Sequence, residues 1–277
     1  MELEYLLPDQ ALSDYVRAYY YFATPTDAMQ PICAELANIR IVLEGSGELI
    51  MPERAPTPIT SAFLIGPTSG AYLMHAHAGT RVFGIGIRPR GWAHLFSINA
   101  FEAADKILDL TDVARKVAGV ELAEVTQADD LATMAKVCDR YFAALLERRT
   151  GRINPYPQAI ETWLLNDDDL NIDHLMQTMS VSRRQMDRLA KKYFGASPKV
   201  LQRKYRALRA ADRLREGIVH WRAAAGPSFY DQSHFIKEFK TFVGVTPAQY
   251  MDNQAALMRA VQAKRHLNHV DLPLASV

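Results

Sequence analysis

Cysteine is scarce in this 277-residue chain, and it has neither a long apolar run nor a basic amino terminus. The two cysteines, Cys33 and Cys138, are far apart and lack the Cys-x-x-Cys spacing of zinc and redox sites. A disulfide framework is therefore excluded, and two buried thiols are expected. No apolar stretch is long enough to cross a bilayer, and residues 1–5 are acidic where a signal peptide would be basic. We expect a cytoplasmic protein with no membrane partner.

The sequence also lacks the signatures of catalysis. It contains no Gly-x-Ser-x-Gly motif, no phosphate-binding glycine loop and no Gly-x-Gly-x-x-Gly motif after a strand. His75 and His77 would share one face of a strand and could begin a cupin metal centre, but the glutamate and the later histidine of such a centre are absent. We predict no catalytic residues, no metal ligands and no cofactor, and keep a cupin-type metal-dependent enzyme only as an alternative.

Charge is distributed unevenly, although the formal net charge is only +1. Residues 1–150 contain 13 basic and 19 acidic side chains, whereas residues 151–277 contain 19 basic and 12 acidic ones. Twelve of the basic residues fall within positions 182–216. A basic segment of this kind suits a phosphate backbone, and the alternative is a helix face that only water contacts.

An internal repeat lies in the basic half. Residues 194–198 read Phe-Gly-Ala-Ser-Pro, and residues 243–247, 49 positions later, read Val-Gly-Val-Thr-Pro. Ser182 and Asp231 each stand 16 residues before the proline of their motif. Each copy therefore predicts a helix N-cap, about three helical turns, a glycine stop and a second helix that begins at Ser-Pro or Thr-Pro. This is the pattern of two helix-turn-helix units.

The first unit is predicted over about residues 172–194. Ser182 and Gln185 form a capping box, and the helix that follows buries one apolar face. Its outward residues are Arg183, Arg184, Asp187, Arg188 and Lys191. A long helix over residues 198–216 repeats apolar side chains at helical spacing and would hold the two units apart.

The second unit is predicted over about residues 220–243, with Asp231 as the helix N-cap. Its inward residues are Phe235, Phe239 and Phe242, and its outward residues are Gln232, Ser233, His234, Lys237 and Lys240. Arginine can bridge two acceptors of guanine, glutamine can pair with adenine, and lysine serves guanine or phosphate. Both outward sets are therefore suited to reading bases in a groove, and the alternative is that both helices only pack a bundle.

The acidic half has a different pattern. Short segments rich in β-branched and aromatic residues predict strands at residues 15–22, 37–43, 48–51, 62–65, 71–75 and 81–87. Residues 90–150 read as mainly helical, with one long helix over 120–149 that glycine and proline end at residues 150–157. Its apolar residues Leu122, Leu131, Met134, Val137, Tyr141 and Leu145 would form either a dimer interface or an intramolecular contact.

Residues 160–250 resemble the paired helix-turn-helix domain of AraC/XylS-type transcriptional regulators. The most specific match is residues 229–235, Phe-Tyr-Asp-Gln-Ser-His-Phe, followed by Gly-Val-Thr-Pro-Ala-Gln-Tyr at 244–250. The resemblance implies two recognition helices in successive major-groove segments. It assigns base contacts to Arg184, Asp187, Arg188, Gln232, Ser233, His234 and Lys237. Arg183, which also points outward, is added to the predicted DNA-binding residues. Residues 63–67 and 83–91 resemble the cupin-like companion domains of the same regulators, which sense small molecules or mediate dimerisation.

Three features depart from the family pattern, one of them Ala190, which stands where the first unit more often has a large aromatic residue. Serine stands at both turns, Ser180 and Ser228, where the family usually places glycine to reach a positive φ. Pro227 removes a backbone donor near the end of the helix that precedes the second turn. The second unit is expected to be the looser one.

The predicted fold class is α+β. Residues 1–150 would form a cupin-like barrel or sandwich with flanking helices, as a regulatory domain, and residues 151–277 an all-α DNA-binding domain. The predicted function is a sequence-specific transcriptional activator or repressor that contacts the major groove of double-stranded DNA. A small-molecule effector, RNA polymerase and a second copy of the chain are candidate partners. The alternative is a protein-interaction adaptor that binds another regulator through its acidic half.

With this function, some basic residues are expected to read bases and others to contact phosphate. Arg188 is expected to read a base, so that Arg188→Ala weakens the cognate site selectively. Lys204 is expected to contact phosphate, so that Lys204→Ala weakens binding evenly across sequences.

Overall fold

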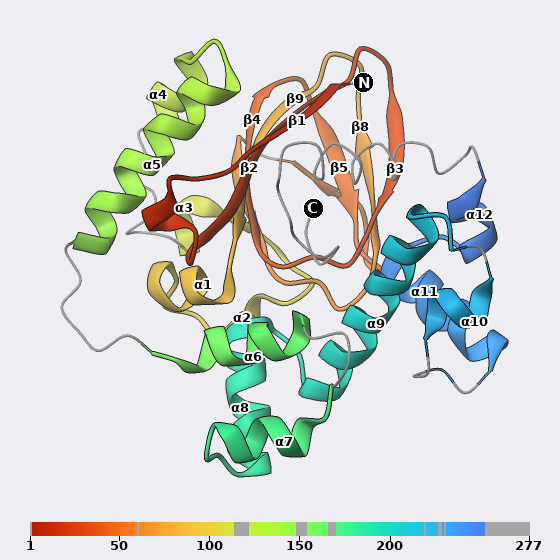
Figure 1. The fold of residues 1–277 in the computed structure, drawn as a ribbon. Coiled ribbons are helices and arrows are strands. Elements are labelled where there is room, and N and C mark those ends of the chain that lie inside the picture. The colour runs from red at the N-terminus through yellow and green to blue at the C-terminus, as the bar shows by residue number, and fades with distance from the viewer. Residues whose placement is uncertain are drawn as a thin grey trace.

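The computed structural model describes residues 2–59, 61–113, 122–147, 154–165, 170–218, 220–226, 229 and 231–252. In these ranges a strand-rich amino-terminal part packs against a helical carboxy-terminal part (Figure 1). The predicted α+β class is confirmed. The domain boundary predicted at residue 150 lies within residues 148–153, outside the described ranges. No helix in those ranges is long and apolar enough to cross a membrane.

Two antiparallel sheets form the amino-terminal part (Figure 1). Within the described residues, one sheet has six strands in the order β1-β2-β9-β4-β7-β10, and the other has four in the order β3-β8-β5-β6. The strands of the larger sheet are β1 (Glu2–Leu6), β2 (Val16–Ala23), β9 (Arg81–Ile87), β4 (Asn38–Glu44), β7 (Ala62–Ile65) and β10 (Ile107–Asp109). Those of the smaller sheet are β3 (Ala28–Ile32), β8 (Tyr72–Ala76), β5 (Gly47–Ile50) and β6 (Thr57–Pro58). The two sheets enclose the interior of a cupin-like barrel.

Side chains alternate across the larger sheet and separate two cores. On β2, Tyr19 belongs to the outer core beneath the flanking helices, whereas Tyr20 belongs to the interior of the barrel. On β4, Ile39 and Ile41 pack in the outer core with Tyr19. Arg40, between them, therefore points into the barrel interior. A charged side chain is placed inside the barrel by the strand period alone.

The six strands predicted from sequence correspond to β2, β4, β5, β7, β8 and β9, each within one residue at either end. Strands β1, β3, β6 and β10 are not predicted from the sequence. Strand β3 contains Pro31, is only partly buried and pairs with β8 alone at the edge of its sheet. Strand β10 lies in a region expected to be mainly helical and forms because it pairs with β7. Both depend on partners distant in sequence.

Short helices flank the barrel: η1 (Gln10–Leu12), α1 (Pro89–Leu95), α2 (Ala100–Ala103) and α3 (Leu110–Val113). The single helix predicted over residues 120–149 is wrong. The structure has α4 (Leu122–Gln127) and α5 (Leu131–Glu147) instead. The Asp130 carboxylate accepts the Thr133 amide at 2.8 Å and the Thr133 hydroxyl at 3.0 Å. Because such a carboxylate caps the first turn of a helix, it begins a new helix at this point.

The apolar face of α5 packs against the outer side of the barrel. Its members Leu131, Met134, Val137, Tyr141 and Leu145 belong to the outer core or border it, and the side chain of Leu122 lies outside the description. On the same helix, Asp139 accepts the Tyr19 hydroxyl at 2.8 Å. Of the two roles left open by the sequence, the described residues show the intramolecular contact, and a role in dimerisation stays a prediction.

The helical part consists of α6 (Tyr156–Leu165), α7 (Ile172–Thr178), α8 (Arg183–Phe194), α9 (Pro198–Arg215), α10 (Trp221–Ala225), α11 (Gln232–Val243) and α12 (Pro247–Met251). In Figure 1, α9 runs obliquely between the group α6 to α8 and the group α10 to α12, beside the barrel. One apolar core contains residues of both groups and of α9. Cys33 and Leu36 from the segment before β4 belong to the same core, so the two parts of the chain share it.

Candidate nucleic-acid interface and effector cavity

Helices α7 and α8 form the first predicted unit. Ser180, in the turn between them, has a φ of 52°, so this serine adopts the left-handed conformation for which the family uses glycine. The Ser182 hydroxyl accepts the Gln185 amide at 3.3 Å, and Gln185 Oε1 accepts the Ser182 amide at 2.9 Å. The predicted capping box is confirmed, and it fixes where α8 begins.

The first two turns of α8 carry four of the predicted DNA-contacting residues. Arg183, Arg184 and Arg188 are exposed, and Asp187 is partly exposed. Arg184 and Arg188 are four residues apart and therefore lie on one face of the helix. Asp187 Oδ2 lies 2.8 Å from Lys191 Nζ, one turn further along. This ion pair leaves the two arginines as the side chains of α8 best suited to base acceptors.

Helix α11 carries the other four predicted contacts. Gln232, Ser233, His234 and Lys237 are all exposed, whereas Phe235, Phe239 and Phe242 are buried. The Asp231 carboxylate accepts the His234 amide at 2.8 Å and caps the helix as the sequence predicts. The effect expected of Pro227 and Ser228 lies outside the described residues.

Both helices end at a glycine that lies against the barrel. Gly195 follows α8 with a φ of 77°, and Gly244 follows α11 with a φ of 92°. A Cβ on Gly195 would lie 3.1 Å from Pro67 Cβ, and one on Gly244 would lie 3.0 Å from Pro31 Cβ. The carboxyl ends of α8 and α11 are therefore held at the barrel, while the predicted contacts lie at their amino ends.

Lys204 does not have the phosphate-contacting position expected of it. It lies in α9 with 2% of its surface exposed, and its ammonium donates to the Glu35 carbonyl at 2.6 Å and to the Thr68 carbonyl at 3.0 Å. Burial lowers the pKa of Lys204 to about 7. The sequence does contain the signal, because position 204 is three residues after Leu201 and four before Leu208, on the apolar stripe of the helix.

Lys204 is one of several contacts between the barrel and the helices. The Ala34 amide donates to the Phe242 carbonyl at 2.7 Å, and the Ala71 amide donates to the Thr241 carbonyl at 2.8 Å. Both carbonyls lie in the last turn of α11, where a helix leaves acceptors without helical partners. The barrel therefore supplies hydrogen-bond donors to the last carbonyls of α11.

A cleft of about 950 Å³ separates α11 from the barrel loop after β5. Ser233 and Lys237 of α11 border it on one side, and Met51, Glu53 and Arg54 border it on the other. Two of the predicted DNA contacts therefore face the barrel across open space. They are not covered by it.

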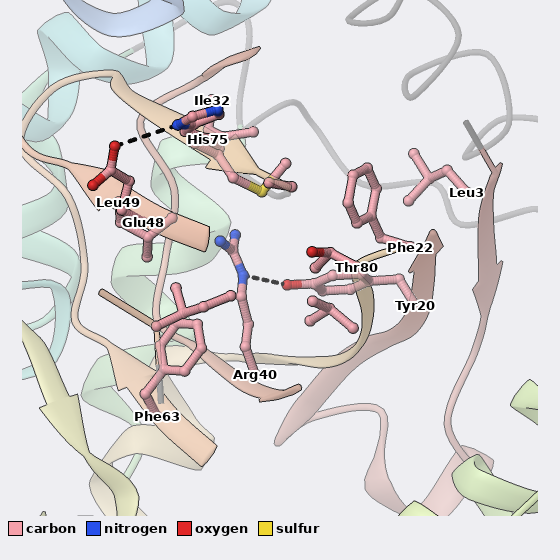
Figure 2. A pocket seen from close by; sticks show the side chains of 14 residues that line it. Leu3, Tyr20, Phe22, Ile32, Arg40, Glu48, Leu49, Phe63, His75 and Thr80 are labelled. Atoms are coloured by element: carbon pink, nitrogen blue, oxygen red, sulfur yellow. Dashed lines mark hydrogen bonds and ion pairs between the residues drawn. The ribbon is translucent and has the colours of Figure 1, made fainter. Parts of the chain in front are cut away.

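The interior of the barrel contains a second cavity, of about 60 Å³ (Figure 2). Its walls are almost entirely apolar and include Leu3, Phe22, Ile32, Leu49, Phe63 and Val82. Figure 2 shows Arg40 among the residues that line the cavity, with its Nε donating to the Tyr20 hydroxyl at 2.7 Å. No effector-binding residue is predicted from the sequence, although the strand period of β4 places Arg40 inside the barrel.

His75 and His77 approach each other, with ring centroids 4.8 Å apart, but their Nδ1 atoms contact different groups. His75 Nδ1 lies 3.3 Å from Glu48 Oε1, and His77 Nδ1 lies 2.9 Å from the Ser46 hydroxyl. Among the described residues, no group of three or more His, Cys, Asp or Glu side chains could hold a metal ion.

Comparison with known proteins adds two family matches. Residues 175–253 match a family described as "Helix-turn-helix domain", and residues 4–109 match one described as "Domain of unknown function (DUF6597)". The HTH-type transcriptional regulator GbdR of Pseudomonas aeruginosa, from strains UCBPP-PA14 and PAO1, is 30% identical over 91 residues. The match covers 32% of this chain and 24% of GbdR, so it spans about a quarter of the length of that relative.

Two solved structures are similar over most of the chain. ToxT from Vibrio cholerae is 14% identical with a TM-score of 0.49, over 84% of this chain and 97% of ToxT. The AraC-like transcriptional activator CuxR is 13% identical with a TM-score of 0.31, over 73% of this chain and 84% of CuxR.

Proposed function

We propose that the chain is a sequence-specific DNA-binding transcriptional regulator, because residues 175–253 are the DNA-binding domain of an AraC/XylS-type regulator. One observation supports this function above the others. Two helices, α8 and α11, are each capped by a side chain at the amino end and expose hydrogen-bonding residues in their first turns. A helix with this end free can enter the major groove and read base edges there.

Within α8, Arg184 and Arg188 are proposed to bridge the O6 and N7 acceptors of guanine. Asp187 is proposed to accept from the amino group of cytosine, and its ion pair with Lys191 reduces its repulsion of phosphate. Arg183 lies nearest the cap, where contacts to phosphate position a helix on the duplex.

Within α11, Gln232 is proposed to pair with adenine, and Lys237 with guanine or phosphate. Ser233 and His234 are shorter donors close to the cap. The free backbone amides there favour a phosphate oxygen. The two helices would read two groove segments about one helical turn, roughly 34 Å, apart.

The barrel is proposed to be the regulatory part. Its interior cavity can hold a small-molecule effector, and the contacts of Lys204, Ala34 and Ala71 would carry the effect of occupancy to α9 and α11. RNA polymerase and a second copy of the chain are proposed as further partners. A protein that reads chromosomal DNA works in the bacterial cytoplasm, and neither catalysis nor a cofactor is part of this function.

The test is selection of bound fragments from random double-stranded DNA by the full chain. The proposal expects a recovered motif with two recurring segments. No enrichment over the starting pool would contradict it and would favour the protein-interaction adaptor.

A further inference from the structure

We propose that Glu238 is a positioning residue for DNA binding by α11, which holds the His234 ring at Nε2 so that Nδ1 of the same ring donates to a phosphate of the DNA backbone. The inference rests on the proposed function, in which His234 is a DNA contact and Glu238 has no role. It makes the contact depend on a proton, because an imidazole donates from both nitrogens only when it is charged.

Glu238 is a buried carboxylate on a helix that is proposed to read DNA. It is 3% exposed, and the buried Phe235, Phe239 and Phe242 belong to the same helix. It stands four residues after His234, about one helical turn further along. Taking a carboxylate out of water is costly unless charged or hydrogen-bonded partners replace the water. The partners of Glu238 therefore indicate what it does.

Two arginines of α9 act on this carboxylate. Arg203 contacts Glu238 Oε1 through both Nε and Nη2, each at 2.6 Å. Burial lowers the pKa of Arg206, and the charge of Glu238 opposes this change. Arg203 therefore connects α11 to α9, but both of its contacts reach one oxygen of the carboxylate.

The second oxygen, Glu238 Oε2, is buried and has no hydrogen-bond partner among the described residues. A buried acceptor without a donor costs free energy, so a donor is missing from this site. His234 Nε2 lies 3.7 Å from Oε1 of the same carboxylate. A small rotation of the two side chains would bring this nitrogen within the distance of a hydrogen bond, about 2.7–3.2 Å. The ring and the carboxylate are therefore placed to pair at Nε2.

The backbone of His234 is fixed, while its ring stays accessible. The main-chain amide donates to the Asp231 carboxylate at 2.8 Å, and the Phe229 ring lies beside the imidazole with a centroid distance of 5.7 Å. The His234 side chain is 44% exposed. In the described part of the chain, no hydrogen bond or ion pair involves its Nδ1. His234 lies in the first turn of α11, where free backbone amides favour a phosphate oxygen.

The charge of the ring determines whether Nδ1 can bind phosphate. When Nε2 donates to Glu238, the neutral ring has no proton on Nδ1, which is then an acceptor and repels a phosphate oxygen. The charged ring donates from both nitrogens, and the carboxylate on one side and the phosphate on the other both stabilise its charge. DNA binding therefore takes up a proton wherever the ring of the free chain is neutral, and the affinity falls as the pH rises. The other charged groups near His234 and Glu238 are the Asp231 carboxylate and Lys237 ammonium of α11 and the guanidinium groups of Arg203 and Arg206 of α9.

The test measures the affinity of the full chain for a DNA fragment from the selection, at one salt concentration, between about pH 6 and about pH 8, where imidazole titrates. The wild type should lose at least about threefold in affinity across this range. His234→Gln should bind more weakly than the wild type at the lower pH and show a flat profile. A wild-type profile as flat as that of His234→Gln would overturn the proposal.

Glu238→Gln keeps the shape of the side chain and removes its charge. We expect it to weaken binding by at least about threefold near pH 6 and to move the fall in affinity to lower pH. In the His234→Gln background the same substitution should have no further effect on affinity. An equal loss with and without His234 would mean that Glu238 only connects α11 to α9, and it would overturn the proposal.

Arg203→Gln is the matched control, because it breaks the same contact between α9 and α11 from the other side. A purely structural role of Glu238 predicts the same change for both variants. The proposal predicts opposite changes, since without Arg203 the carboxylate is less neutralised and the fall in affinity should move to higher pH. A shift of both profiles in the same direction would contradict it. If one of the two variants does not fold, the direction of the shift in the other, compared with His234→Gln, decides.

The outcomes also separate this inference from the proposed function. A failed DNA selection would remove the proposed function and the inference together. A selected site that the chain binds without any pH dependence from His234 would remove the inference alone.

Discussion

Three basic side chains of the helical part, Arg184, Arg188 and Lys204, have different surroundings and therefore different expected roles. Arg184 and Arg188 are exposed on one face of α8. Lys204 is buried in α9 and bound to two main-chain carbonyls of the barrel. Charge alone, as counted along the sequence, does not separate these roles. Burial does.

For Arg188→Ala we predict a loss of about 1–3 kcal/mol in binding to the selected site, because a bidentate contact to guanine would be removed. Random DNA should be bound nearly as well as before. Lys192→Ala, which removes one exposed charge further along α8, is the matched control and should weaken both DNAs alike. Titration of both DNAs at one salt concentration measures this, and equal losses for Arg188→Ala would refute base reading by Arg188.

For Lys204 we predict a pH dependence of stability. Burial lowers its pKa from 10.5 to about 7. Between these values the unfolded chain holds a proton that the folded chain does not, so unfolding takes up a proton and stability rises with pH. The free energy of unfolding of the wild type should therefore rise relative to Lys204→Met from about pH 7 to about pH 10. Urea denaturation of both proteins tests this, and a constant or falling difference would be incompatible with a buried Lys204.

At the scale of elements, the helix caps and helix ends were predicted from the sequence, because they depend on residues that are close together in the chain. The capping box at Ser182, the cap at Asp231 and the glycine stops depend on residues within one helical turn, and all of them are present. The division between α4 and α5 at Asp130 was missed because the apolar pattern continues across it. Strands β3 and β10 form through pairing with β8 and β7, and such long-range partners leave little trace in a short window of sequence.

The carboxyl ends of α8 and α11 allow a prediction about their docking. Gly217, after α9, has a φ of 95° and open space around it, so Gly217→Ala should cost only the conformational term of about 1 kcal/mol. Gly195→Ala and Gly244→Ala add contacts at 3.1 Å and 3.0 Å with the barrel. Their loss of stability should be larger by about 1 kcal/mol or more. Chemical denaturation of the three variants measures this, and equal losses would mean that the barrel does not constrain these helix ends.

At the scale of the whole molecule, the barrel and the helices are joined by a common core and by hydrogen bonds that reach both α9 and α11. The sequence predicted the two kinds of fold and the faces of α8 and α11. It could not predict this joint surface, because its contacts connect residues more than 130 positions apart, as in the bond from Lys204 to Thr68. The barrel cavity could not be predicted for the same reason, since its walls come from strands that are distant in sequence.

The central claim is that α8 and α11 contact one DNA duplex at the same time, in two major-groove segments. The most direct measurement is the affinity of the full chain for its selected site before and after about five base pairs are inserted between the two recurring segments, which turns one segment by half a helical turn. The account predicts a loss of at least about tenfold, because the two segments no longer face the two helices together. An affinity that does not change with the insertion would contradict simultaneous reading by the two helices.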